Sequence, residues 1–162
     1  MQGFRDGDKF RFFDPGLRFP GVDCELVIKK ATGINYMKAM IDIALNNSCE
    51  ISNAESCYKL NNMISSVLYL NVKPGKIKRI INDKKIKDSP SVVSYLPRCR
   101  VGDEISWSFN VNQRFAEIDI LSNSFDELID TMDTIQKNIV VEDVNGENMI
   151  FNLFDLNRIE RN

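Results

Sequence analysis

Hydrophobic and charged side chains alternate in two short segments at the start of the chain. These segments cover residues 2–5 and 9–13, and the sequence Asp-Gly-Asp at 6–8 between them is typical of a tight turn, so the pattern predicts a β-hairpin. A Pro-Gly pair at 15–16 ends the second strand. Because the chain begins inside this hairpin, with no earlier element to pack against it, we expect the chain to be a piece of a larger protein.

Two helices are expected after the hairpin. Asp23 is expected to N-cap a helix over residues 24–31, and Gly33 is expected to stop it. Apolar residues at helical spacing predict a second, stronger helix over residues 35–45. Residues 52–62 are polar, and their pattern fits a short helix and a loop equally well.

From residue 63 onward the pattern changes to short alternating segments separated by turn sequences. A capping box at Ser124–Glu127 predicts one helix there, which runs to about residue 138. Asn145-Gly146 is the strongest hairpin signal in the chain. Strands are expected over 66–72, 76–81, 92–96, 104–111, 114–121, 139–142 and 148–152, with turns at 73–75, 82–84 and 101–103 and a helical turn within 153–162.

This change of pattern predicts an α+β fold in two units. The first unit, residues 1–58, holds the hairpin and its helices. The second unit, residues 63–162, is expected to be β-rich and mostly antiparallel, with the one well-capped helix.

Composition limits the chemistry that the chain can perform. The absence of histidine excludes Ser-His and Cys-His nucleophiles and histidine zinc sites, whereas hard cations bound by oxygen stay possible. The four cysteines are irregularly spaced, and we expect reduced thiols. A net charge of −2, no membrane-length apolar run and no signal-peptide pattern favour a cytoplasmic protein that does not bind membranes or nucleic acid.

The end of the predicted hairpin carries side chains suited to metal and phosphate. Asp14 and Arg18 lie four positions apart just after the second strand, and Gln2 lies twelve positions before Asp14. With Gly16, this pattern resembles the end of the ATP-binding domain of ATP-grasp enzymes, such as biotin carboxylase and the large subunit of carbamoyl phosphate synthetase. The order of turns and strands after residue 63 resembles the C-terminal domain that follows in biotin-carboxylase-type members.

The resemblance implies a role for each of these residues. In that family, a Glu on the first strand and an acid-x-Asn-x-Arg segment twelve residues later hold Mg²⁺ and meet the phosphate. Carried over, Asp14 and Gln2 are the expected metal ligands and Arg18 the expected catalytic residue, with ATP and Mg²⁺ as cofactors of the full-length assembly. Gln2 stands where the family has Glu, and Gly16 where it has Asn. This site therefore offers one carboxylate and one neutral carbonyl oxygen.

The resemblance also implies an activity. It is that of an ATP-dependent ligase, which activates a carboxylate as an acyl phosphate for attack by an amine or similar nucleophile. The nucleotide-binding lysines, glycine-rich lid and adenine pocket of such enzymes precede the hairpin, and this chain does not contain them. We therefore expect the chain to be inactive alone and to need the missing N-terminal portion or a partner subunit. An apolar hairpin also favours pairing, including a homo-oligomer. A non-enzymatic module that docks a partner protein is the alternative.

Each candidate residue also has a simpler interpretation. Asp14 could cap the turn that follows it, Arg18 could form a surface ion pair with Asp14 or Asp23, and Gln2 could face solvent. The basic residues between 73 and 87 could bind nucleic acid, but they are not interleaved with aromatics, which favours a solvated, charged edge strand. Trp107 and some of the N-terminal phenylalanines are expected in the core.

Overall fold

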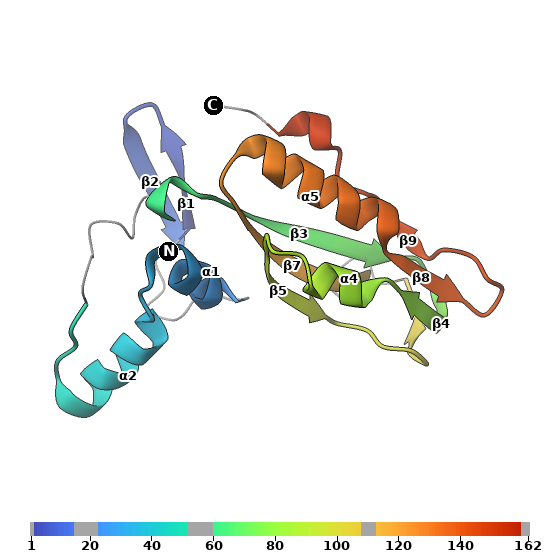
Figure 1. Cartoon of the computed structure of the whole chain (residues 1–162), viewed down its shortest axis with the longest axis horizontal. Coiled ribbons are helices and arrows are strands. Elements are labelled where there is room, and N and C mark those ends of the chain that lie inside the picture. Colours follow the sequence, from blue (N-terminus) through green and yellow to red (C-terminus); the bar gives the residue numbers. More distant parts are fainter. Residues whose placement is uncertain (1, 15–22, 52–59, 108–112, 160–162) are drawn as a thin grey trace.

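Antiparallel strands and helices make an α+β fold, which confirms the class expected from the sequence (Figure 1). The computed structural model describes residues 2–14, 23–51, 60–107 and 113–159. Its elements are β1 (Gln2–Asp6), β2 (Lys9–Asp14), α1 (Cys24–Thr32), α2 (Tyr36–Asn46), η1 (Leu60–Asn62), β3 (Ile64–Val72), β4 (Gly75–Ile81), α4 (Asp83–Lys87), β5 (Val92–Pro97), β6 (Glu104–Ile105), β7 (Arg114–Ser122), α5 (Phe125–Asn138), β8 (Val140–Asp143), β9 (Ile150–Phe151) and η3 (Leu156–Arg158).

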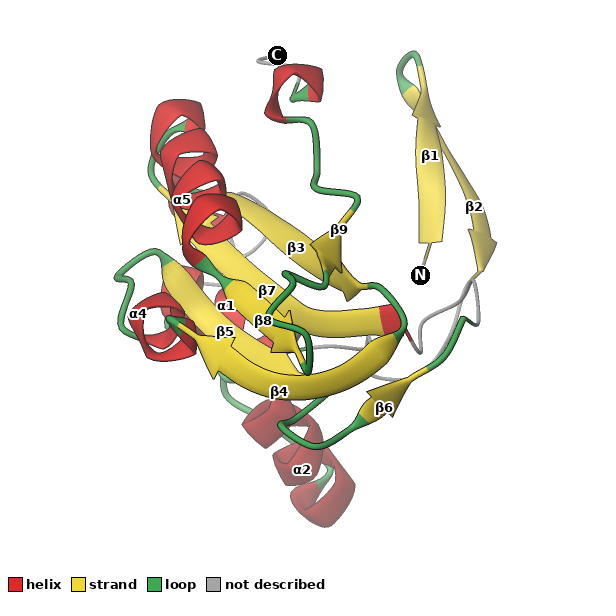
Figure 2. Ribbon diagram, turned by 90° about the vertical axis from the view of Figure 1, so that its right-hand side faces the viewer, coloured by secondary structure: helices red, strands yellow, loops and turns green. Residues whose placement is uncertain are grey.

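The expected N-terminal hairpin is present. Strands β1 and β2 pair with each other and form a two-stranded sheet of their own among the described residues. Gly7 supplies the left-handed backbone of the turn, with φ of 58°. Figure 2 shows the hairpin standing beside the larger β unit. On β2, Phe10 and Phe12 are 68% and 59% exposed, so these two are not among the N-terminal phenylalanines expected in the core.

Both helices of the N-terminal unit form close to their predicted limits. Gly33 ends α1 in the left-handed conformation, and Asn35 caps α2 by accepting a hydrogen bond from the Lys38 amide at 3.0 Å. Asp23 precedes α1, but its side chain does not cap the helix. Its carboxylate instead accepts a hydrogen bond from Ser94 on β5, so a tertiary partner replaces the expected local one.

A four-stranded antiparallel sheet in the order β5-β7-β3-β9 forms the centre of the β unit (Figure 2). Helix α5 covers one face, and its Leu128, Met132 and Ile135 belong to the same buried cluster as Ile118 and Ile120 of β7. Ser124 caps α5 as predicted, since its hydroxyl accepts from the Glu127 amide at 3.1 Å. On α1, Val27 and Ala31 form a second, smaller cluster with Leu121 of β7.

A three-stranded sheet in the order β6-β4-β8 completes the β unit. Strand β4 is its central strand, so the basic segment that contains β4 does not guard a sheet edge as expected. The expected turn at 82–84 is instead the start of the short helix α4, which follows a left-handed Asn82. The segment after Asn145-Gly146 also differs: Asn148 forms one bridge to Glu142, but β9 pairs with β3 and not with β8.

The strand expected before β7 and the expected core position of Trp107 both differ in the structure. The strand expected over 104–111 ends at Ile105 as β6, and residues 108–112 lie outside the described part. Trp107 is 55% exposed and stands edge-on to Phe151, so it is not a core residue.

Cys24, Cys49 and Cys99 are free thiols, as expected, and Cys57 lies outside the described residues. In the described part of the chain, every helix is too short or too polar to cross a membrane.

Candidate functional sites

The backbone register of the hairpin brings two of the predicted ligands together. From Asp6 opposite Lys9 to Gly3 opposite Phe12 the pairing is regular, and continuing it would place Phe13 opposite Gln2. A register shift between Gln2 and Gly3 places Asp14 opposite Gln2 instead. The two residues are therefore cross-strand neighbours at the open end of the hairpin.

This backbone register is compatible with the metal site that the resemblance implies. Mg²⁺ is usually held by one or two carboxylates together with substrate phosphates, and Asp14 with Gln2 can supply two of these oxygen ligands. Arg18 lies outside the described residues, so its relation to this pair, and the role of all three residues, stays a prediction.

A buried ion cluster lies in the β unit, at a position that the sequence did not single out. Glu117 of β7 is 2% exposed, and its Oε1 accepts from Arg98 Nη2 at 2.7 Å, Arg98 Nε at 2.9 Å and Arg114 Nη1 at 2.9 Å. The sheet positions these groups, because Glu117 pairs with Tyr69 of β3 and Leu96 of β5. The Arg114 guanidinium also lies 3.9 Å from the centre of the Tyr69 ring, a cation–π contact.

Two arginines stabilise the ionised form of Glu117. Burial alone would raise the pKa of Glu117, but the hydrogen bonds and positive charges of Arg114 and Arg98 outweigh it and hold the pKa below its ordinary value. The second carboxylate oxygen, Oε2, is buried and has no hydrogen-bond partner among the described residues. Leaving such an oxygen unpaired costs about 1–3 kcal/mol or more.

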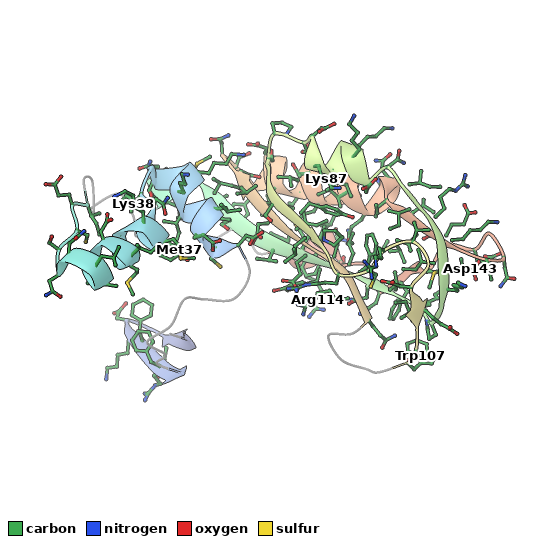
Figure 3. The ribbon with its side chains drawn as sticks, turned by 90° about the horizontal axis from the view of Figure 1, so that it is seen from below. Met37, Lys38, Lys87, Trp107, Arg114 and Asp143 are labelled. Atoms are coloured by element: carbon green, nitrogen blue, oxygen red, sulfur yellow. The ribbon has the colours of Figure 1, made fainter. Side chains whose placement is uncertain are left out.

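A cavity of about 660 Å³ adjoins this cluster. Figure 3 shows Arg114 on the side of the strands opposite to helix α4, which carries Lys87. The cavity is lined by Arg98, Cys99, Asp103, Glu104, Ile105, Arg114 and Glu117. Its wall therefore combines two guanidinium groups with three carboxylates.

A second acidic residue on β7 is buried near the start of α1. Asp119 is 2% exposed, and burial, followed by the charges of Asp23, Glu117 and Glu25, raises its pKa from 3.8 to about 6. Within the described residues, no group of three or more Cys, Asp or Glu side chains could hold a metal ion. Asp119 is therefore a buried carboxylate whose charge is disfavoured by the acidic residues around it.

The alternation on β7 gave no signal for these sites. Glu117 and Asp119 occupy one face of a strand whose other face carries Ile118 and Ile120, and such a pattern predicts a polar face in solvent. In the structure both faces of β7 are buried, because α5 packs on the face of Ile118 and Ile120, and α1 packs on Leu121, which shares the face of Glu117 and Asp119. A carboxylate in the middle of such a strand requires a partner, and Arg98 and Arg114 supply it to Glu117.

The fold is similar to part of the fold of two solved enzyme structures. No family model matches the chain, and no curated protein matches it significantly. A solved L-amino acid ligase from Bacillus licheniformis matches 72% of the chain at 17% identity, with a TM-score of 0.55. A solved phosphoribosylglycinamide synthetase from Anaerococcus prevotii also matches 72%, at 19% identity and a TM-score of 0.50. At these identities the likeness concerns the fold alone, and it agrees with the fold class expected from the sequence.

The chain spans only part of each matched structure. The match covers 29% of the ligase chain and 29% of the synthetase chain. Most of each of these proteins therefore has no counterpart in the present chain.

Proposed function

We propose that this chain is the C-terminal portion of an ATP-dependent ligase of the ATP-grasp type, with ATP and Mg²⁺ as cofactors. The full protein would join a carboxylate to an amine or similar nucleophile through an acyl phosphate, as in carbamoyl phosphate synthetase. The single observation that carries the proposal is the register shift that makes Gln2 and Asp14 cross-strand neighbours. The similarity of the fold to two ligases supports it.

The proposed roles follow from the chemistry of the three residues. Asp14 and Gln2 would give oxygen ligands to Mg²⁺, which would supply charge neutralisation at the ATP phosphates. Arg18 would use its planar guanidinium to hold and stabilise the phosphoryl oxygens. Each of these residues acts by positioning and charge, and none needs to exchange a proton.

The exposed apolar surface of the N-terminal unit supports the need for a further portion. Phe10 and Phe12 of β2 are exposed, and so are four apolar residues of α2, namely Met40, Ile41, Ile43 and Leu45. The β unit, in contrast, has a large core of its own around β7 and α5. We propose that residues 1–58 complete an ATP-binding domain with a missing portion or partner subunit, and that residues 63–162 form a biotin-carboxylase-like C-terminal domain in a cytoplasmic enzyme.

The test uses the full-length gene product and matched substitutions at the two ends of the hairpin. Phosphate release from Mg²⁺·ATP is followed against a panel of carboxylic acids and amines. Asp14→Asn should lower the rate at least about 10²-fold, as expected for the loss of charge stabilisation at a phosphoryl group. Asp6→Asn is the control, because Asp6 lies at the turn end of the same hairpin in an exposed ion pair with Arg11. Equal activity of the two variants would contradict the metal role of Asp14.

The isolated 162-residue chain provides a second test. It lacks most of the length of the ligases it resembles, so we expect no ATP turnover above the level of a preparation of the Asp14→Asn chain. Turnover that disappears in this variant would overturn the proposal that the chain is inactive alone.

A non-enzymatic docking module is the second candidate, and the exposure of Phe10 and Phe12 favours it. In this case the paired substitution Phe10→Ser and Phe12→Ser should abolish association of the chain with itself or a partner. The full-length gene product would then show no phosphate release with any acid. Substrate-dependent release by that product would reject this alternative.

A further inference from the structure

The Arg98–Glu117–Arg114 cluster has features that stability alone does not explain. A buried ion pair contributes little to stability compared with apolar residues of the same size, because both charges must leave water. Here the carboxylate is shared by two guanidinium groups, and its Oε2 has no hydrogen-bond partner in the described part of the chain. An incompletely paired buried polar group requires an explanation, and a ligand or ordered water at the cavity beside it would supply one.

The cluster holds two guanidinium groups ready at the wall of the cavity. Glu117 uses only Nε and Nη2 of Arg98 and Nη1 of Arg114, while each guanidinium has five N–H donors. Tyr69 and Glu117 fix the orientation of Arg114, and Arg98 is about half exposed. Guanidinium groups that are held in this way bind a carboxylate with little further loss of side-chain freedom.

The other charges of the cavity restrict the ligand. Asp103, Glu104 and Glu117 place three negative charges on the wall, against the two positive charges of Arg98 and Arg114. Asp103 also accepts a hydrogen bond from the Arg100 amide at 3.0 Å and lies 3.6 Å from the exposed Arg100 guanidinium, so Glu117 and Asp103 each have a positive partner and Glu104 is the further acidic group on the rim. A free anion such as phosphate would be repelled by the carboxylates, and a free cation would be repelled by the guanidinium groups. A molecule that carries a negative and a positive group a short distance apart can place each group beside the opposite charge of the wall.

We propose that this cavity binds a small zwitterion of the α-amino-acid class. Its carboxylate would lie on the guanidinium groups of Arg98 and Arg114, and its ammonium group on the acidic rim formed by Asp103 and Glu104. The cavity of about 660 Å³ lies within the size range of small-molecule sites. This inference goes beyond the proposed function, because it uses no residue of the hairpin and requires no ATP.

Binding is tested on the 162-residue chain by nuclear magnetic resonance, without nucleotide. The probes are glycine, L-alanine and L-glutamate, with acetate, methylammonium and inorganic phosphate as single-charge controls. We expect saturable shifts of the Arg98 and Arg114 side-chain signals with at least one amino acid, and binding at least about tenfold weaker for each control. Absence of saturable shifts with every amino acid, or equally tight binding of a control, would overturn the proposal.

Variants assign the binding to the cluster. Arg98→Gln should weaken binding of the amino acid by about tenfold or more, whereas Arg79→Gln should leave it unchanged. Arg79 is a matched control, because it is 62% exposed and pairs with Glu142 at 2.6 Å in the other sheet. Arg98 is preferred to Glu117 for this test, since a half-exposed side chain can be replaced with less effect on folding. Equal binding by the two variants would remove the cluster from the site, whatever the outcome of the ATP experiments.

Discussion

Ser94 of β5 donates a hydrogen bond to the carboxylate of Asp23, which lies 71 positions earlier in the chain. Asp23 immediately precedes α1, so the bond ties the start of this helix to the edge strand of the main sheet. Val27 and Ala31, further along α1, pack on Leu121 of β7. Lys30 of α1 also donates to the Pro90 carbonyl at 2.8 Å, so both polar and apolar contacts hold α1 to the β unit.

Replacing Ser94 should weaken the attachment of α1. Ser94→Ala removes the donor and leaves the Asp23 carboxylate without it, which should lower the free energy of unfolding by about 1–3 kcal/mol. Amide hydrogen exchange should accelerate in α1 more than in α5. Ser65→Ala is the control, because Ser65 is exposed on β3 and should give a change within about 0.5 kcal/mol. Identical exchange in the two variants would mean that the hydrogen bond does not hold the helix.

Asp119 should make the stability of the protein depend on pH. Its pKa is about 6 in the folded protein, against an ordinary value of 3.8, so the folded state binds the proton more tightly than the unfolded state. Stability should therefore rise as pH falls from above 6 toward 4, because protonation removes the cost of burying the charge and the repulsion from Asp23, Glu117 and Glu25. Cys24 on α1 also lies within the field of Asp119, which contributes to its raised pKa.

The variant Asp119→Asn tests this assignment. It should be more stable than the wild type at pH 7–8 by about 1–3 kcal/mol, and the rise in stability on acidification should be much smaller. The measurement is urea unfolding at a series of pH values. Asp130→Asn on the exposed face of α5 serves as the control and should retain the wild-type pH profile. A wild-type profile in Asp119→Asn would assign the pH dependence to another group.

Local signals predicted the elements that depend on neighbours in sequence. Helix α5 begins where Ser124 caps it, and Gly33 stops α1, because both effects involve backbone groups within four residues. The hairpin was also predictable, but its register at Gln2 was not. The shift that places Asp14 opposite Gln2 is an irregularity at the open end, where the turn no longer fixes the pairing.

The errors concern features that only the tertiary structure decides. A period of two shows which side chains of β7 share a face, but not that the face carrying Glu117 and Asp119 is covered. The partner of β9 could not be predicted either. Asn145-Gly146 makes a turn regardless of which strand the following segment pairs with. Arg98 became part of a site only through pairing of β5 with β7, nineteen positions from Glu117. No local pattern around residue 98 indicates this contact.

Trp107 provides an optical probe, since it is the only tryptophan in the chain. Its indole is more than half exposed, and its ring centre lies 5.8 Å from that of Phe151 at 87°. We expect red-shifted fluorescence, typical of an indole in contact with water, and efficient quenching by acrylamide. Phe151→Leu should increase the quenching and cost about 0.5–1.5 kcal/mol. Blue-shifted emission that resists acrylamide would contradict the exposed position.

One side chain of α5, that of Gln136, pairs with the backbone of the C-terminal segment. Gln136 donates from Nε2 to the Phe154 carbonyl at 3.2 Å and accepts from the Phe154 amide through Oε1 at 2.8 Å. The side chain thus pairs with the backbone of Phe154 as a neighbouring strand would. Because this amide is largely buried, losing it leaves two backbone groups of the segment without partners.

Gln136→Ala should therefore release the segment that follows β9. We expect a loss of about 1–3 kcal/mol in the free energy of unfolding and faster proteolytic cleavage after residue 152, while the core around β7 stays intact. Lys137→Ala is the matched control on the same helix turn, since Lys137 forms only an exposed pair with Asp133 at 2.6 Å. If cleavage is as slow in Gln136→Ala as in this control, other contacts hold the segment, and the packing of η3 on α5 becomes the next candidate.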